Sequence, residues 1–287
     1  MDSVQGIQKT IPIAGTRMST PRIYAAVIGA LKPSLSDGAI HLDIGAGRGE
    51  LIKELGGVCK VTSYACDFHV ERFDASIPCE QVNLNTERLP YADRQFDIVT
   101  CSEVIEHLEN YRGLLREAFR VSKIGATVVF TTPNVLNMRS RVRYFFAGFA
   151  NLFGPLPVRN DKLYSTDGHI TPIPFFYLAH ALLDAGFDDV KLRIDKAQRT
   201  SVVLATLFWP IIAIGRFRFM RRERKRFGTI TAENGGLVAT HFLWPILVGR
   251  TIVVSARKME DPATNIVPIK KPLRANMGDA AGFADLV

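Results

Sequence analysis

Short apolar runs alternate with amphipathic stretches from residue 39 to about residue 195. Residues 50–55, 111–122 and 174–186 carry apolar positions at helical spacing, and the last stretch ends near Gly186, where helix C-termini favour glycine. The strands we expect are residues 39–45, 60–67, 96–101, 126–132 and 189–194. Continuous apolar strands separated by helices are typical of a parallel sheet with helices on both faces, so we expect an α/β fold.

The segments on either side of this pattern define the expected domain organisation. Residues 22–31 predict a helix that caps the core, and residues 250–258 alternate as one more strand. Between them, residues 200–215 and 234–249 are uncharged, and each is broken by a proline. The division we expect is residues 1–199 as the core, 200–250 as a hydrophobic and basic insertion, 251–258 as the last core strand and 259–287 as a weakly ordered tail.

Composition limits the kinds of partner. An apolar share of 47% supports a real core and excludes wholesale disorder. The net charge of +8 favours an anionic partner, such as nucleic acid, a phospholipid surface or a phosphorylated substrate. No cysteine pair has CxxC spacing, so Cys59, Cys66, Cys79 and Cys101 are expected as small core residues in a reducing cytosol. The first residues hold an acid and no long apolar run, which argues against a secretory signal.

A glycine-rich stretch, LDIGAGRGE at residues 42–50, lies between an expected strand and an expected helix. Glycines at 45, 47 and 49 allow a tight turn and let backbone N–H groups approach a ligand closely. Glycine triplets occur at the same place in dinucleotide-binding enzymes, but this one is GxGxG preceded by Asp43. The stretch resembles motif I of the class I S-adenosylmethionine-dependent methyltransferases.

The resemblance continues at the spacing typical of that family. Asp67 ends the second strand, where the family keeps an acid for the ribose hydroxyls, and Asn83 stands where the family usually has aspartate. The resemblance implies a Rossmann-like, seven-stranded sheet, mostly parallel with an antiparallel last strand, and S-adenosylmethionine as the cofactor. The cofactor-binding residues it implies are Asp43, Gly45, Ala46, Gly47, Gly49, Asp67, Asn83, Leu84, Cys101 and Ser102.

The stretch CSEVIEHL, residues 101–108, follows the expected fourth strand. In a helix, Glu103, Glu106 and His107 would share one face, and three interpretations stay open. The acids stabilise a helix N-terminus, or His107 acts as a general base. The third comes from resemblance to ubiquinone-biosynthesis O-methyltransferases and small-RNA 2′-O-methyltransferases. In the RNA enzymes, two acids and two histidines bind a divalent cation. That resemblance implies a Mg²⁺, Mn²⁺ or Zn²⁺ site at Glu103, Glu106, His107 and His169, with the first three also as catalytic residues.

Residues 216–226 contain seven arginine and lysine residues and one acid, and lie between two apolar segments that each contain Trp-Pro. Aromatic rings beside clustered cations suit the interface of an anionic membrane, although a buried helix pair with a solvated basic connector remains open. On the membrane interpretation we expect a cytoplasmic enzyme held at the inner face of the membrane. It would methylate an oxygen of a lipid-borne or small-molecule acceptor, either a quinone precursor or a lipid-linked glycan. RNA 2′-O-methylation and an inactive, cofactor-binding membrane scaffold are the alternatives.

Overall fold

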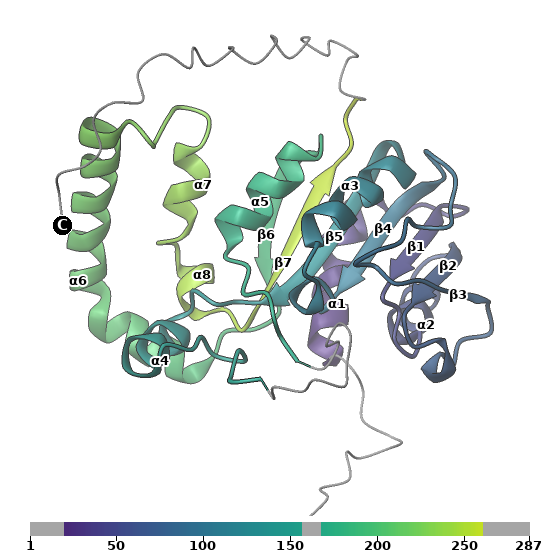
Figure 1. Cartoon of the computed structure of the whole chain (residues 1–287), viewed down its shortest axis with the longest axis horizontal. Helices are drawn as coiled ribbons and strands as arrows, with labels where there is room; N and C mark the ends of the chain where they lie inside the picture. The colour runs from purple at the N-terminus through teal and green to yellow at the C-terminus, as the bar shows by residue number, and fades with distance from the viewer. Residues whose placement is uncertain (1–19, 157–167, 261–287) are drawn as a thin grey trace, which may run out of the picture.

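The protein is described by a computed structural model covering residues 20–156 and 168–260, and its centre is one twisted sheet (Figure 1). The strand order is β3-β2-β1-β4-β5-β7-β6. The strands are β1 Ile40–Ile44, β2 Thr62–Asp67, β3 Cys79–Gln81, β4 Phe96–Ser102, β5 Ser122–Pro133, β6 Asp188–Ile194 and β7 Thr251–Arg257. Only β7 runs antiparallel to its neighbours. The predicted fold class is therefore confirmed. The three-residue edge strand β3 lies outside the predicted strands.

Helices cover both faces of the sheet. On one face, α1 (Pro21–Leu31) and α2 (Glu50–Gly56) pack Val27, Leu31 and Leu55 against Ile98 and Val253 of the sheet. On the other face, α3 (Tyr111–Val121) and α5 (Phe175–Asp184) join the largest buried cluster. These helices lie close to their predicted ranges, because each carries the apolar stripe that the sheet buries.

The insertion leaves the sheet after β6 and returns just before β7, and an isolated bridge between Ala197 and Gly249 closes its base. It contains α6 (Arg199–Arg222), a π-helical turn (Glu223–Phe227), α7 (Gly235–Thr240) and α8 (Trp244–Val248). Figure 1 shows α6 standing at the side of the molecule, beyond α7 and away from the sheet. Its first turns pack Ala205 against Met138 of α4 (Met138–Ala147) and against Leu247 of α8.

Two expectations for the insertion need correction. Pro210 does not break the helix, because α6 continues through it for 24 residues. The basic run is also no solvated connector, since residues 216–222 are the last turns of α6 itself. The second apolar segment does break, and Pro245 occupies the first turn of α8, where its missing N–H costs nothing. Of the four cysteines, Cys66 and Cys101 are buried and the other two are half-buried. Most of the predicted tail, residues 261–287, lies outside the described residues.

Candidate functional site

A cavity of about 350 Å³ opens where the carboxyl ends of β1, β2 and β4 meet. Crevices at this edge of an open parallel sheet are where such folds bind ligands. The predicted site residues that line it are Asp43, Gly45, Ala46, Gly47, Asp67, Asn83, Leu84, Ser102, Glu103, His107 and His169. Three others do not: Gly49 begins α2, Cys101 is buried within β4, and Glu106 is buried beside the cavity.

The glycine loop forms one wall of the cavity. Gly45 has a φ of 69°, and a Cβ there would come within 2.3 Å of Val104 Cγ2, so only glycine fits. The N–H of Gly47 donates to Asp67 Oδ2 over 2.8 Å, and the N–H of His69 donates to Asp67 Oδ1 over 2.7 Å. These two bonds fix the carboxylate of Asp67 at the end of β2, on the cavity wall.

Asp43 lies at the floor of the same wall, almost completely buried. Burial raises the pKa of Asp43 to about 7, although the hydroxyl of Thr100 donates to its carboxyl over 2.8 Å and acts in the opposite direction. The imidazole of His41 lies 2.8 Å from the same hydroxyl, and burial lowers its pKa to about 3. A neutral histidine and a carboxyl of raised pKa thus share one hydroxyl under the glycine loop.

Glu103 and Glu106 do not share a helix face, contrary to expectation. β4 ends at Ser102, Glu103 takes a left-handed φ of 57°, and only residues 105–107 form a short 3-10 turn. The N–H of Glu103 donates to Thr131 Oγ1, and Glu103 Oε1 accepts from that hydroxyl over 3.1 Å. Burial raises the pKa of Glu103 to about 7, while Arg250 lowers it. Glu103 therefore turns toward β5 and Arg250.

Glu106 instead turns into the protein. Neither oxygen of its buried carboxyl has a hydrogen-bond partner, and burial together with Glu103 raises its pKa well above the usual value. The nearby hydroxyl of Thr132 lowers that pKa but completes no hydrogen bond. The backbone carbonyl of Glu106 accepts from the N–H groups of Ile170 and Thr171, both over 2.9 Å. These two bonds hold the segment that carries His169 against the 3-10 turn.

His107 and His169 meet as a result. The Nδ1 of His107 lies 2.8 Å from the carbonyl oxygen of Gly168, which assigns the neutral ring a proton on Nδ1 and a lone pair on Nε2. The two imidazole rings lie edge to face with centroids 4.8 Å apart. Burial and the neighbouring His107 lower the pKa of His169, and its Nδ1 is buried without a hydrogen-bond partner.

One ligand atom each from Glu106, His107 and His169 falls within 4.8 Å of the others. The predicted fourth ligand, Glu103, is not part of this group. A carboxylate and two imidazoles, two of the three with buried unpartnered atoms, are a donor set that a divalent cation could complete.

The sequence analysis missed several cavity residues, namely Tyr24, Leu51, Phe68, His69, Arg72, Asn85, Val104, Leu108, Leu152 and Arg250. Phe68 and His69 directly follow Asp67, so their position next to a predicted cofactor-binding residue could have identified them as cavity residues. No local signal marks Arg250, which reaches the cavity from the point where the insertion returns to the sheet. The guanidinium of Arg250 lies 3.9 Å from Asp195, and its buried Nη1 forms no hydrogen bond.

A seven-stranded sheet with one antiparallel strand, and a cavity wall formed by a glycine loop with acids directly beside it, are typical of the class of S-adenosylmethionine-dependent methyltransferases. The chain belongs to the methyltransferase-domain family, which matches residues 17–192. The acidic and amide groups beside the glycine loop fit the hydroxyl and amine donors of S-adenosylmethionine.

Known relatives agree with this assignment. A demethylmenaquinone methyltransferase from Oceanobacillus iheyensis is 29% identical over 119 residues, which are 40% of this chain and 50% of that protein. A ubiquinone biosynthesis O-methyltransferase from Pseudomonas fluorescens is 28% identical over 114 residues, which are 37% of this chain and 47% of that protein. The chain therefore spans about half the length of these curated relatives. The crystal structure of a SAM-dependent methyltransferase from Archaeoglobus fulgidus shares the fold with a TM-score of 0.50, at 18% identity, over 82% of this chain and 94% of that one.

Proposed function

We propose that this enzyme transfers a methyl group from S-adenosylmethionine to an oxygen of a lipid-borne acceptor, with a quinone precursor as the first candidate and a lipid-linked glycan as the second. The observation that carries the proposal is a single cavity with two chemically different ends. One end has the glycine loop with Asp67 and Asn83, and the other has His107 and His169. Relatives named for quinone methylation supply the order of the two acceptors.

The glycine-loop end would hold the cofactor. Asp67 offers carboxylate acceptors for ribose hydroxyls, Asn83 offers an amide for the adenine ring, and Ser102 would line the methionine portion. Bound S-adenosylmethionine supplies an electrophilic methyl group. The task left to the chain is to align the acceptor oxygen and remove its proton.

His107 is the residue we propose for that proton. Its Nδ1–H is held by the carbonyl of Gly168, so the lone pair on Nε2 is oriented to accept the hydroxyl proton of an acceptor. As the proton arrives, the same carbonyl stabilises the imidazolium that forms. A mobile surface histidine has no such partner to hold its tautomer.

A divalent cation held by Glu106, His107 and His169 is the second candidate mechanism. It is favoured by the two unpartnered carboxyl oxygens of Glu106, because a buried carboxylate costs roughly several kcal/mol unless it is protonated or a cation compensates its charge. The cation would lower the pKa of the acceptor hydroxyl. Chelation with EDTA decides between the two: full activity in EDTA supports His107 acting without metal, and loss restored by Mn²⁺ or Zn²⁺ supports the cation.

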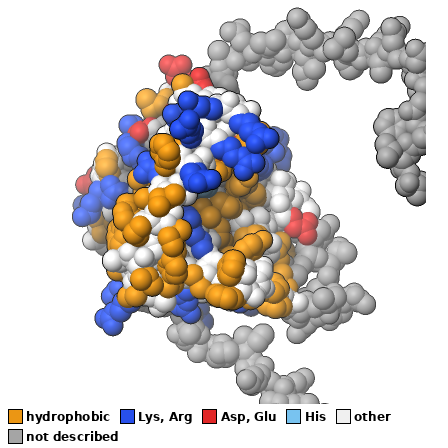
Figure 2. All heavy atoms as spheres, turned by 90° about the vertical axis from the view of Figure 1, so that its left-hand side faces the viewer, with side chains coloured by type: hydrophobic (Ala, Val, Ile, Leu, Met, Phe, Trp, Pro, Cys, Tyr) orange, Lys and Arg blue, Asp and Glu red, His pale blue; other side chains and the backbone are white. Residues whose placement is uncertain are grey.

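The membrane part of the proposal rests on an exposed apolar surface. Tyr144, Phe145 and Phe146 of α4 project into solvent, with Phe145 81% exposed, and Leu207 and Ile211 of α6 are also exposed. Figure 2 looks at this side of the molecule and shows a broad hydrophobic area with arginine and lysine side chains gathered toward one end. Contiguous apolar area of this kind marks an interaction surface, and the adjoining cations favour an anionic membrane.

The length of α6 raises a second possibility, that this helix crosses the membrane. Together with the π-helical turn it forms one helix, Arg199–Phe227, with a mean hydropathy of 1.6 over its most apolar window and only 11% of that window buried. Within the described residues it is the one helix apolar and long enough to cross a bilayer. We propose that it lies on the surface, because its last turns carry a cluster of arginines.

The experiment combines purified full-length protein, S-adenosylmethionine with a labelled methyl group, and vesicles containing quinone precursors with an unmethylated ring hydroxyl. The expected result is labelled lipid, with more product from acceptor in vesicles than from an equal amount of a short, water-soluble analogue. Lipid-linked glycans and RNA serve as the other acceptors in parallel reactions. Tight cofactor binding with no labelled product from any acceptor would favour the scaffold alternative and contradict the proposal.

A further inference from the structure

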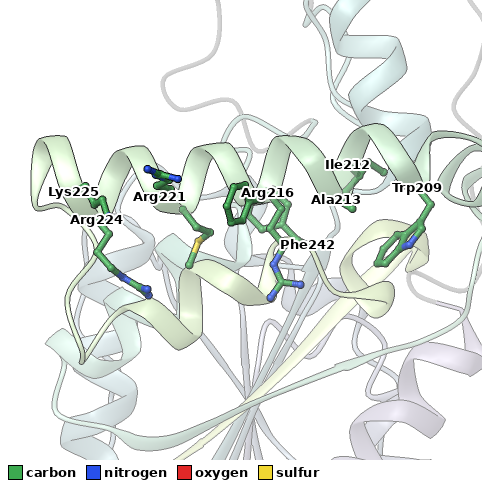
Figure 3. A pocket seen from close by; sticks show the side chains of 10 residues that line it. Trp209, Ile212, Ala213, Arg216, Arg221, Arg224, Lys225 and Phe242 are labelled. Atoms are coloured by element: carbon green, nitrogen blue, oxygen red, sulfur yellow. The ribbon is translucent and has the colours of Figure 1, made fainter.

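A groove of about 620 Å³ along α6 has no role in the site described above. None of its lining residues lines the cofactor cavity, so it is a separate site. It is formed by one face of α6 and by Phe242, which follows α7, with Trp209, Ile212, Phe217 and Met220 as its main apolar residues. In Figure 3, Trp209 and Arg216 of α6 and Arg224 of the π-helical turn extend to the same side, toward the segment that carries Phe242.

Helical spacing explains why these side chains face one groove. The helical residues in the groove are 209, 212, 213, 216, 217, 220 and 221 of α6 and 224 of the π-helical turn, which follow one another at intervals of one or three residues. Such positions form one continuous stripe along a helix. The stripe begins with an indole at Trp209 and ends with cations, so the groove changes from apolar to basic along its length.

The basic end of the groove holds four cations with no opposing charge. Arg216, Arg221, Arg224 and Lys225 line it, and in the described part of the chain none of them forms an ion pair. Glu223, the one acid among residues 216–226, instead accepts a hydrogen bond from Thr229 over 2.5 Å. Four cations without counter-charges repel one another, so a bound anion would lower the energy of this end.

Other arginines of α6 have a different environment. Arg222 lies over the ring of Phe227 at 5.1 Å, and Arg218 and Arg222 line a neighbouring depression of similar volume, which shares Phe217, Arg221 and Lys225 with the groove. They lie in line with Ile211 and Ile214 at helical spacing, not with the groove residues. This difference supplies matched substitutions for a test, because both faces can lose the same charge from the same helix.

We propose that the groove binds one anionic phospholipid of the membrane, with its phosphate among Arg216, Arg221 and Arg224 and an acyl chain toward Trp209. Three features support this occupant over a soluble anion. The groove is amphiphilic along its length, it adjoins the exposed apolar surface of α6, and guanidinium groups suit phosphate oxygens. The inference rests on the proposed membrane association. It adds a specific binding site for a lipid headgroup, which would determine the orientation of the enzyme on the bilayer.

The test compares two double variants of full-length protein. Arg216→Gln with Arg224→Gln removes two groove cations, and Arg218→Gln with Arg222→Gln removes two cations from the other face. Binding is measured by co-sedimentation with vesicles of phosphatidylcholine containing about one fifth phosphatidic acid or phosphatidylglycerol, near physiological salt, where diffuse attraction is partly screened. Both pairs lose part of the general attraction, so the groove proposal predicts that the first pair weakens binding at least tenfold more than the second. Equal weakening would overturn it, because that result requires only diffuse charge.

Three further readouts identify the source of the anion and separate this proposal from the methylation itself. Millimolar inorganic phosphate should leave vesicle binding unchanged, and displacement by phosphate would overturn the choice of a lipid. Stronger binding to RNA than to anionic vesicles, lost in the groove pair, would also overturn it, as would a dimer that only the groove pair disrupts. Methyl transfer to a water-soluble acceptor should be the same in both variants and wild type. If that activity is absent in all three while lipid binding follows the groove, then the proposed function fails and the groove site stands.

Discussion

The cofactor cavity and the α6 insertion are built by opposite physical means. In the cavity, key polar groups are tied to the backbone, as the half-buried Asp67 is to Gly47 and His69. Along α6, apolar side chains are exposed and cations lack counter-charges, as with Leu207 at 69% exposure and the groove arginines. The described cavity is lined by groups of this chain that already contact one another, whereas the exposed apolar surface of α6 is of the kind that a membrane or a partner covers.

This contrast separates the region expected to carry out catalysis, the cavity, from the region expected to bind the membrane, the insertion. The cavity can be preorganised because the sheet edge holds every group before a ligand arrives. The insertion contributes Arg250 to the cavity where it returns to the sheet, packs Ala205 and Leu247 near α4, and exposes most of the rest of α6. Substitutions in the cavity should therefore change chemistry without changing location, and substitutions on the insertion should do the reverse.

The largest expected effect that tests this contrast is the loss of His107. His107→Ala should lower kcat by roughly 10²- to 10⁴-fold, because the acceptor oxygen loses its proton acceptor. Co-sedimentation with anionic vesicles should not change. The measurement is methyl transfer to a water-soluble acceptor at saturating cofactor. His180→Ala removes an exposed histidine of α5 and should keep activity near wild type. Activity in His107→Ala within about threefold of that control would rule out His107 as the base.

The next effect concerns the glycine loop. Gly45→Ala should weaken S-adenosylmethionine binding by about tenfold or more, since its Cβ would meet Val104 at 2.3 Å and force the loop to move. Gly148→Ala is a matched control with the same φ of 69° and no atom within 4 Å of the added Cβ. Both variants should lose about 1–2 kcal/mol from backbone strain, so calorimetric titration of the cofactor separates the clash from the strain. Equal affinities would show that the loop tolerates a side chain.

A smaller effect, on vesicle binding, is expected from substitutions in the exposed apolar surface of α4. Phe145→Ser with Phe146→Ser removes two exposed rings of α4 and should weaken vesicle binding by about tenfold, given about 0.7 kcal/mol for each partly inserted ring. Turnover of a water-soluble acceptor should stay unchanged. Ile124→Ser, also at an exposed apolar residue but at the start of β5, is the control. If both changes reduced vesicle binding alike, the α4 surface would have no special part in docking.

Sequence patterns predicted the cavity better than the insertion, for a physical reason. Strand ends and the glycine loop depend on local periodicity and on backbone conformation, which neighbouring residues encode. Six of the seven strands were therefore located, and β3 was missed because three residues carry too little pattern. For α6, the proline predicted a break, but Pro210 lies within a continuous helix. Most of this helix is exposed, so its apolar residues are not confined to one buried face and their spacing could not indicate where the helix begins and ends.

The acid and histidine cluster shows where local reasoning ends. A helical face for Glu103, Glu106 and His107 was a fair local expectation, but the left-handed φ of Glu103 sends the two acids in different directions. That turn is set by contacts with Thr131 of β5 and by the backbone of residues 170–171, which are distant in sequence. His169 was found because its position after strand five matched a family motif, and Arg250 was missed because no motif contains it.

The smallest predicted effect tests whether the cavity floor is as buried as the contrast requires. The pKa of Asp43 is raised to about 7, against about 3.9 in an unfolded chain. Between about pH 4 and pH 7 the folded protein thus keeps a proton that the unfolded chain loses, so this group's contribution to stability falls as pH rises through that window. Asp43→Asn abolishes this titration and keeps an oxygen that can accept from Thr100.

Relative to wild type, the Tm of Asp43→Asn should therefore increase by several °C from pH 4 to pH 7, since about 1 kcal/mol moves Tm by roughly 2–4 °C. The measurement is calorimetry of both proteins without cofactor. His41, whose pKa is lowered to about 3, makes both proteins less stable as pH falls below about 6.5, so its effect cancels in the difference. A Tm difference that stays constant with pH would mean that Asp43 ionises normally. The cavity floor around Asp43 would then be accessible to water, and the contrast between a buried cavity floor and an exposed insertion would be weaker.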